Sequence, residues 1–118
     1  TKSKQCEDRH MNKIHYDEFA EYMISEVKKM RDAGQKEYAE EENVFADFES
    51  TAKLSGITPE IVIYTFLNKH IRGIGSYLKG HEKQRDTLDG RIKDAIVYLQ
   101  LLWAYVDEKE WQGINASK

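Results

Sequence analysis

The stretch TPEIVIYTFL at residues 58–67 decides the fold class of this chain. Taken alone, the apolar run would fit a buried strand as well as a helix. The three residues before it favour a helix: the Thr58 oxygen can cap free backbone NH groups, Pro59 is pre-set for the first helical position, and Glu60 suits the positive end of the helix dipole. We therefore predict a helix at residues 59–79.

The apolar pattern behind this cap continues at spacings of three and four residues, as expected for one buried face of a helix. The residues of this predicted face are Ile61, Tyr64, Leu67, Ile71, Ile74 and Leu78. Gly73 and Gly75 flank Ile74 and cost helix stability. The sequence therefore predicts either a bend at this point or another backbone packed closely against it.

Three further helices are predicted on either side of this one. Residues 17–33 have helical apolar spacing, with Asp17 as a cap and Gly34 as a stop. Residues 41–54 form a shorter helix ended by Gly56, and residues 87–110 form a helix with a wide apolar face. No alternation typical of strands is present, so the sequence predicts an all-α bundle of about four helices. Since the last helix is apolar on two sides and carries Trp103, we expect homo-oligomers formed through the last helices.

Length and composition place the chain among single-domain proteins. Its 118 residues are enough to bury about two thirds of the surface that the unfolded chain exposes. We expect a flexible leader at 1–13, one helical domain at 14–112 and a flexible tail at 113–118. The apolar runs are too short to span a membrane, and a secretion signal and disulfide partners for Cys6 are absent from the sequence, so we expect a cytoplasmic location.

Charge is spread unevenly along the chain. Residues 37–50 carry six acidic side chains and no basic one, whereas residues 69–93 carry seven basic side chains against three acidic ones. The net charge of −3 argues against nucleic acid as a partner, because that affinity depends on neutralising many phosphates. The acidic run is either a solvated turn or a place where a cation binds.

A few polar residues inside the predicted helices are candidates for chemistry. His70 is next to Lys69, with Arg72 two positions on, and this group could meet the phosphates of an anionic ligand. The alternative is a histidine at the edge of the core, hydrogen-bonded to a neighbouring helix. Asp94 lies among apolar residues of the last helix, one turn before Tyr98, so it needs a cation, a basic side chain or a water-filled groove beside it.

Several short motifs occur in a family-like order between residues 36 and 106. They are K-x-Y-A from Lys36, N-V-F-x-x-F-E from Asn43, G-I-T-P-E from Gly56, K-H at Lys69, and R-I-x-D-A-I-x-Y-L-x-L-L from Arg91. This order resembles small bacteriophage proteins related to the all-α, MazG-like nucleotide pyrophosphohydrolases. The resemblance implies magnesium held by acidic residues on antiparallel helices and bridging the phosphates of a nucleoside triphosphate.

Carried over to this chain, the resemblance gives a set of candidate site residues. Magnesium would be held by Glu37, Asp47, Glu49 and Asp94; phosphate would be bound by Lys69, His70 and Arg72; and Tyr38 and Tyr98 would line the groove. The chain departs from the family where Gly90 and Arg91 occupy the turn that should carry an acid before Asp94. Binding a nucleotide with magnesium and hydrolysing it as a pyrophosphohydrolase with a degenerate metal site both fit this pattern.

Two other functions fit the same residues. One is a non-catalytic phage accessory protein that binds and inhibits a host defence protein through its acidic surface. The other is a structural helical oligomer without a ligand. The partner is a nucleotide if the chain acts on nucleotides, and a host protein if it is an accessory protein. If a phage encodes the chain, we expect it in the cytoplasm of the host cell.

Overall fold

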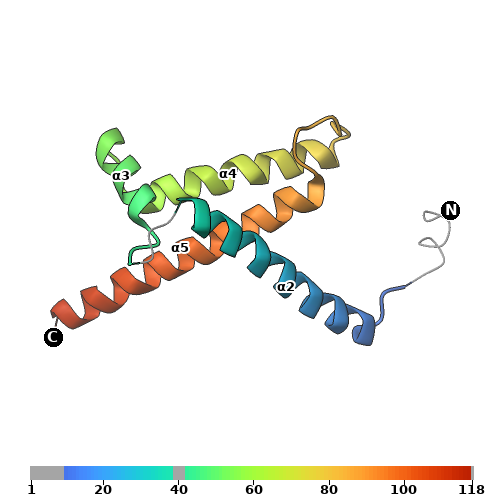
Figure 1. Cartoon of the computed structure of the whole chain (residues 1–118), viewed down its shortest axis with the longest axis horizontal. Coiled ribbons are helices and arrows are strands. Elements are labelled where there is room, and N and C mark those ends of the chain that lie inside the picture. Colours follow the sequence, from blue (N-terminus) through green and yellow to red (C-terminus); the bar gives the residue numbers. More distant parts are fainter. Residues whose placement is uncertain (1–9, 39–41, 118) are drawn as a thin grey trace.

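The computed structural model describes residues 10–38 and 42–117, and the side chains of residues 10–34 and 42–109. Over these ranges the chain forms four helices and no strand (Figure 1). The helices are α2 (Lys13–Tyr38), α3 (Ala46–Ser55), α4 (Pro59–Leu78) and α5 (Leu88–Ser117). The predicted all-α bundle of about four helices is confirmed, and α4 begins at the predicted proline.

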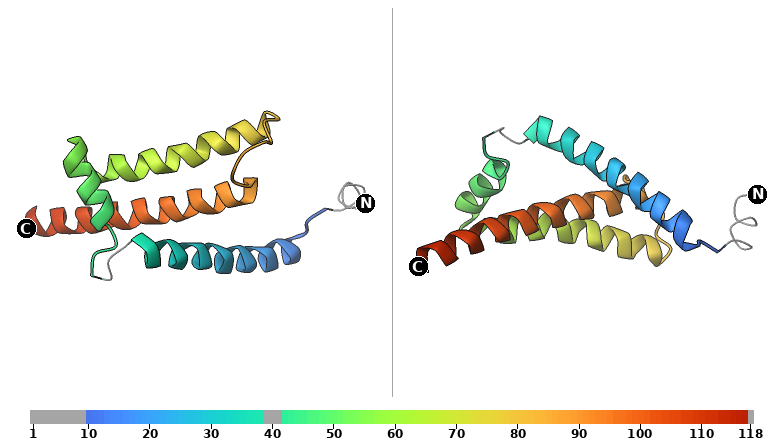
Figure 2. Two further views of the ribbon diagram at one scale, coloured as in Figure 1. Left: turned by 45° about the horizontal axis from the view of Figure 1, so that its top comes forward. Right: turned by 90° about the horizontal axis from the view of Figure 1, so that it is seen from below.

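The helices form two layers. Helices α4 and α5 lie side by side and antiparallel, joined by the loop at 79–87, and α2 and α3 cover one side of this pair (Figure 2). Helix α2 crosses α5, and its N-terminal half runs beyond the edge of the pair (Figure 1). One broad side of the α4–α5 layer is therefore left uncovered by α2 and α3.

The helix ends show which capping predictions hold. Thr58 caps α4 by accepting a hydrogen bond from the Ile61 NH at 3.4 Å, and Gly56 ends α3 in the left-handed conformation, with φ 69°. The prediction that Asp17 caps the first helix is wrong: the Asn12 side chain accepts from the His15 NH at 2.9 Å, while Asp17 pairs with Lys13 inside the helix.

Three predicted boundaries need correction. Gly34 does not stop the first helix, because one interior glycine costs only about 1 kcal/mol and good helix formers follow it. Helix α3 begins at Ala46 rather than at 41, since Asn43 accepts from the Phe45 NH and holds a turn there. The predicted tail from 113 is helical up to Ser117, and residues 1–9 of the predicted leader lie outside the described residues.

The core of the molecule is small and lies where α3, α4 and α5 meet. Ile63 is completely buried there, and Phe45 meets Tyr105 edge to face with ring centroids 5.0 Å apart. Partly buried side chains pack around this cluster: Phe48, Tyr98, Leu101 and Leu102. Phe45 and Phe48 thus anchor the segment that follows α2 to the bundle.

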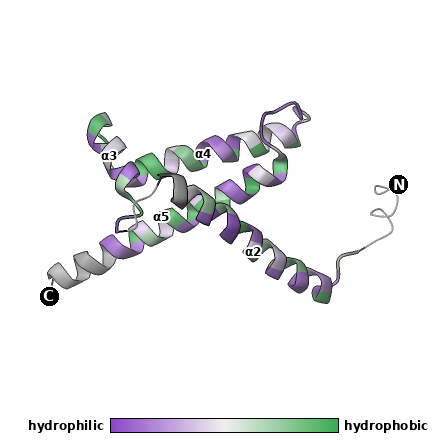
Figure 3. Ribbon diagram, viewed as in Figure 1, coloured by the Kyte–Doolittle hydropathy of each residue, from purple (hydrophilic) through white to green (hydrophobic). Residues whose placement is uncertain are grey.

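The predicted buried face of α4 is largely wrong. The side chains that α4 buries are Val62, Ile63, Leu67 and His70, so only Leu67 of the predicted set is among them. The exposed members of the predicted set are Ile61, Tyr64, Ile71 and Leu78. The face is rotated because α3 and α5 both pack against α4, from directions that the spacing of apolar residues does not reveal. Figure 3 shows apolar residues interspersed with polar ones along α4 and α5.

The loop at 79–87 is tied to both of its helices. The Tyr77 hydroxyl donates to the Asp86 carbonyl at 2.6 Å, and the Gln84 amide donates to the Gly73 carbonyl at 3.0 Å. A Cβ atom on Gly73 would lie 2.5 Å from Arg91 Nε, whereas Gly75 has open space around it. Gly73 therefore makes room for a side chain of α5 rather than for another backbone.

Within the described part of the chain, every helix is too short or too polar to cross a bilayer.

Candidate functional site

A pocket of about 580 Å³ lies between the C-terminal end of α2, the segment leading into α3, and the facing sides of α4 and α5. All four helices contribute to its wall. The residues lining it are Met30, Arg31, Ala33, Gly34, Val44, Asp47, Phe48, Thr51, Phe66, Asp94, Val97, Tyr98 and Leu101. The wall is mostly apolar, and its few charged groups come from three different helices.

Aromatic rings form one side of this pocket. The Phe66 and Tyr98 rings stack nearly parallel, with an interplanar angle of 12° and centroids 5.8 Å apart. Phe48 meets both of them edge to face, at 6.2 Å and 6.4 Å. Because each ring is held by two others, these side chains offer a pre-formed flat surface to a ligand.

His70 lies behind this aromatic surface. Its ring stacks on Tyr98 at 5.5 Å, and only 6% of the residue is exposed. Its Nδ1 atom has no hydrogen-bond partner among the described residues and lies 3.8 Å from Asp94 Oδ2. Burial lowers the pKa of His70 more than the nearby Asp94 carboxylate raises it, and Lys69 and Arg91 lower it further, so the ring is neutral at neutral pH.

The charged groups of the pocket are two carboxylates and one guanidinium. Asp47 comes from the first turn of α3 and Asp94 from the second turn of α5. Arg31, near the end of α2, donates a hydrogen bond from Nη1 to the Gln100 side chain at 3.1 Å. An apolar pocket with a few convergent polar groups is the usual form of a small-molecule site.

The structure brings together only some of the predicted site residues. Asp47, Asp94 and Tyr98 all line the pocket, and His70 lies directly behind Tyr98. Glu49 is exposed and accepts a hydrogen bond from the Asn43 amide at 2.7 Å. The side chains of Glu37 and Tyr38 lie outside the described residues, so their predicted roles remain predictions.

The predicted phosphate-binding group is divided. Lys69 and Arg72 are exposed, whereas His70 points to α5. Arg72 instead lines a shallow pocket of about 380 Å³ near the loop, together with Gly75, Ser76, Lys79 and His81. A contiguous sequence such as Lys69-His70 cannot serve one site here, because neighbours on a helix point about 100° apart.

The fit of magnesium can be judged from the donors that the pocket provides. Among the described side chains, no three or more of the His, Cys, Asp and Glu type are grouped so that they could hold a metal ion. Magnesium, however, is commonly held by one or two carboxylates together with the phosphates of a substrate. Asp47 and Asp94 are therefore donors of the right kind for a magnesium ion that arrives with a nucleotide.

Arg31 and Phe66 are among the pocket residues that the sequence reasoning missed. Arg31 looked like an ordinary base in the last turn of a helix, and Phe66 was one member of an apolar run. The available signal for Phe66 was weak: together with Leu67 and His70 it marks the side of α4 that faces α5. The position of Arg31 depends on the angle at which α2 crosses α5, and sequence spacing does not contain that angle.

Comparison with known proteins returned no matching family model, no matching curated protein and no matching solved structure.

Proposed function

We propose that this protein binds a nucleotide together with magnesium in the pocket between α2, α3, α4 and α5. The observation that carries the proposal is that the stacked rings of Phe66 and Tyr98 line the same pocket as the carboxylates of Asp47 and Asp94. A nucleotide combines a flat aromatic base with a chain of phosphates. A site that binds a nucleotide needs an aromatic surface for the base and side chains that hold cations beside the phosphates.

The base would stack against the aromatic side of the pocket. Stacking of a base on an aromatic side chain stabilises binding by about 1–3 kcal/mol per base and does not depend on which base it is. The pocket volume of about 580 Å³ is within the range of small-molecule sites. His70 contributes by supporting the Tyr98 ring from behind, where its stacking fixes the plane of the ring.

The phosphates would meet Arg31 and the two carboxylates. Asp47 and Asp94 would hold the magnesium ion, which when bound supplies the positive charge that makes anionic phosphates compatible with two aspartates. The Arg31 guanidinium, now hydrogen-bonded to Gln100, can pair with a phosphate oxygen. Hydrolysis of the bound nucleotide is a separate property of the same site, and release of pyrophosphate would measure it.

Thermal unfolding tests the proposal. We expect a nucleoside triphosphate with magnesium to raise the melting temperature of the wild type, because a ligand at about a hundred times its Kd adds roughly 2.7 kcal/mol to the unfolding free energy. Asp94→Asn should abolish the shift and Phe66→Leu should reduce it, while chelation of magnesium should reduce it in the wild type.

Asp107→Asn is the matched control, since Asp107 is an exposed aspartate on the same helix that does not line the pocket. This variant should keep the full shift. The proposal fails if a panel of nucleotides leaves the wild type unshifted, or if Asp94→Asn keeps the full shift. In the first case, binding of a host protein through the acidic surface becomes the better explanation.

A further inference from the structure

The side of the α4–α5 layer that faces away from the pocket carries a series of exposed large apolar side chains. Seven large apolar side chains point to this side, and each is at least 42% exposed. On α4 they are Ile61, Tyr64, Ile71 and Leu78, and on α5 they are Ile92, Leu99 and Trp103. We call these seven residues the open face.

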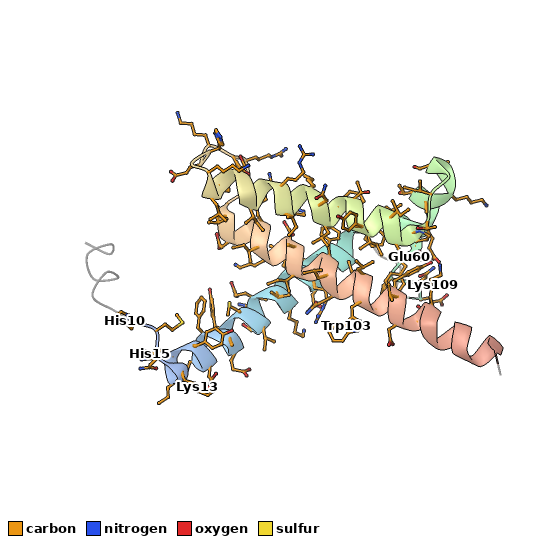
Figure 4. The ribbon with its side chains drawn as sticks, turned by 180° about the vertical axis from the view of Figure 1, so that it is seen from behind. His10, Lys13, His15, Glu60, Trp103 and Lys109 are labelled. Carbon is orange, nitrogen blue, oxygen red and sulfur yellow. The ribbon has the colours of Figure 1, made fainter. Side chains whose placement is uncertain are left out.

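Helix geometry places the open face opposite the pocket. Phe66 points into the pocket, and Tyr64, two residues earlier on α4, points about 160° away from it at 100° per residue. Val97 and Leu99 stand in the same relation on α5. Figure 4, seen from behind, shows α4 and α5 in front of α2 and the Trp103 side chain free of the other helices.

The accessible surface of the chain is larger than that of a compact monomer. It amounts to 9747 Å², whereas a folded monomer of 13.8 kDa exposes roughly 6,600 Å² by the usual scaling with mass. A partner in an interface of standard size contributes about 800 Å², and one tyrosine or tryptophan alone can bury about 150–250 Å². The open face supplies an area of the order that a stable dimer needs.

The charges at the two ends of the α4–α5 layer indicate what covers the open face. The end at the loop is mainly basic, with six basic side chains (Arg72, Lys79, Lys83, Arg85, Arg91 and Lys93) against three acidic ones (Glu82, Asp86 and Asp89). The opposite end is mainly acidic, through Glu60, Asp107 and Glu108 against Lys109. A second copy turned end for end would place the basic end of each copy beside the acidic end of the other.

We propose that a second copy of this chain covers the open face in an antiparallel arrangement, so that the two α4–α5 pairs form a four-helix bundle. The two-fold axis of this dimer lies in the interface and runs perpendicular to the helices. Helix α4 therefore packs against α4 of the second copy, and α5 against α5 of the second copy. A copy with the opposite orientation would place basic ends together, and like charges in contact are unfavourable. The pocket lies on the other side of the layer, so this proposal does not depend on the nucleotide.

The contacts between α4 and α5 show which residues come near the axis. Two contacts fix how positions on α4 correspond to positions on α5: Glu60 lies beside Lys109, and His70 lies beside Asp94. With this correspondence, the open face of α4 lies beside the part of α5 that runs from Leu88 to Asp107. Leu99 lies close to the middle of this span. In the antiparallel dimer Leu99 therefore lies near Leu99 of the second copy, while Ile92 is far from its own equivalent.

Light scattering of the purified chain gives the first test. We expect a dimer for the wild type and a monomer for Ile71→Glu and for Trp103→Glu. Both side chains are exposed in the single chain, so a glutamate there leaves the fold of the monomer intact and destabilises only the dimer interface. Ile24→Glu is the matched control: Ile24 is an exposed isoleucine on α2, outside the open face, and this variant should remain dimeric. Circular dichroism checks that the variants keep their helices.

Two outcomes of this experiment would overturn the proposal. One is a wild type that is monomeric over the whole concentration range measured. The other is dissociation by Phe19→Glu while Ile71→Glu and Trp103→Glu stay dimeric, since that would place the interface on the exposed N-terminal half of α2.

Cysteine cross-linking tests the orientation and does not need a variant that dissociates. In a Cys6→Ser background, Leu99→Cys should form a cross-linked dimer with a short bis-maleimide, and Ile92→Cys should not. Cross-linking of Ile92→Cys with none at Leu99→Cys contradicts the antiparallel arrangement.

Discussion

His70 combines burial, stacking on Tyr98 and a ring nitrogen that has no hydrogen-bond partner among the described residues. This histidine lies at the edge of the core and faces α5, and its Nδ1 makes no hydrogen bond to the described residues. Asp94 is near it at 3.8 Å, which is too long for a hydrogen bond. The two side chains are close enough to influence each other electrostatically without being fixed to each other.

This environment makes stability depend on pH. Since burial lowers the pKa of His70 below its ordinary value of about 6.5, the unfolded chain binds more protons than the folded one at acidic pH. The contribution of His70 is complete above the unfolded pKa and is lost as the pH falls below it, with a slope of at most about 1.4 kcal/mol per pH unit. Chemical denaturation between about pH 7.5 and pH 5, in chelator, measures this loss.

The matched comparison for this prediction uses two histidines. His70→Gln should flatten the pH dependence of the unfolding free energy, whereas His81→Gln, which changes an exposed histidine in the loop, should leave it as in the wild type. Equal pH dependence in the wild type and in His70→Gln would show that His70 does not titrate differently in the folded chain.

The sequence predicted part of the candidate site at the level of single residues. Asp94 was singled out because an acidic side chain among apolar residues needs a cation, a basic side chain or water beside it. Tyr98 was singled out because it follows one turn later, and both residues line the pocket. Lys69 and Arg72 were grouped with His70 by proximity in the chain, and the rotation of α4 separates them. Arg31 and Phe66 join the site through helix packing, which is set by side-chain shape across the interface rather than by spacing along one helix.

At the scale of helices, local signals predicted where α4 begins and where α3 ends. Thr58-Pro59 and Gly56 act through the backbone next to them, so the sequence contains most of what determines them. Gly34 was the exception, because a glycine can remain inside a helix when its neighbours favour one. The buried face of α4 was mispredicted for a different reason: two of its faces are apolar, and only the arrangement of α3 and α5 decides which one is covered.

The glycines of α4 provide a prediction at this scale. Gly75→Ala should raise the unfolding free energy by about 0.5–1 kcal/mol, because alanine favours a helix and nothing lies within 4 Å of the new methyl group. Gly73→Ala should instead lower it by about 1–2 kcal/mol, since the methyl group would displace Arg91 from its contact with Gln84. Urea denaturation of both variants measures the difference; equal effects of the two would mean that Arg91 moves aside freely.

The whole molecule is elongated and unevenly packed. Its radius of gyration is 17.9 Å, compared with about 13.5 Å for a compact domain of this length. Among the described residues of α2, Val27 is the one that is buried, whereas α4 buries four side chains. Stability should therefore be distributed unevenly between the helices.

Hydrogen exchange would show this distribution. We expect backbone amides of α2 before Val27 to exchange faster than those in the middle of α4, because a helix segment without buried contacts opens at little cost in free energy. Mass spectrometry of peptides covering 13–26 and 62–72 compares them directly. Equal protection of the two segments would show that the first half of α2 is held by contacts outside those described for the single chain.

The α4–α5 layer is only one helix thick, and its two sides form the wall of the pocket and the open face. A shift of α4 against α5 would reshape both sides at once. If occupation of the pocket favours one spacing of these helices, it changes the affinity of the open face for its partner, and by thermodynamic linkage binding of that partner changes the affinity of the pocket by the same factor. The thinness of this layer thus makes it a natural place for ligand binding and self-association to regulate one another.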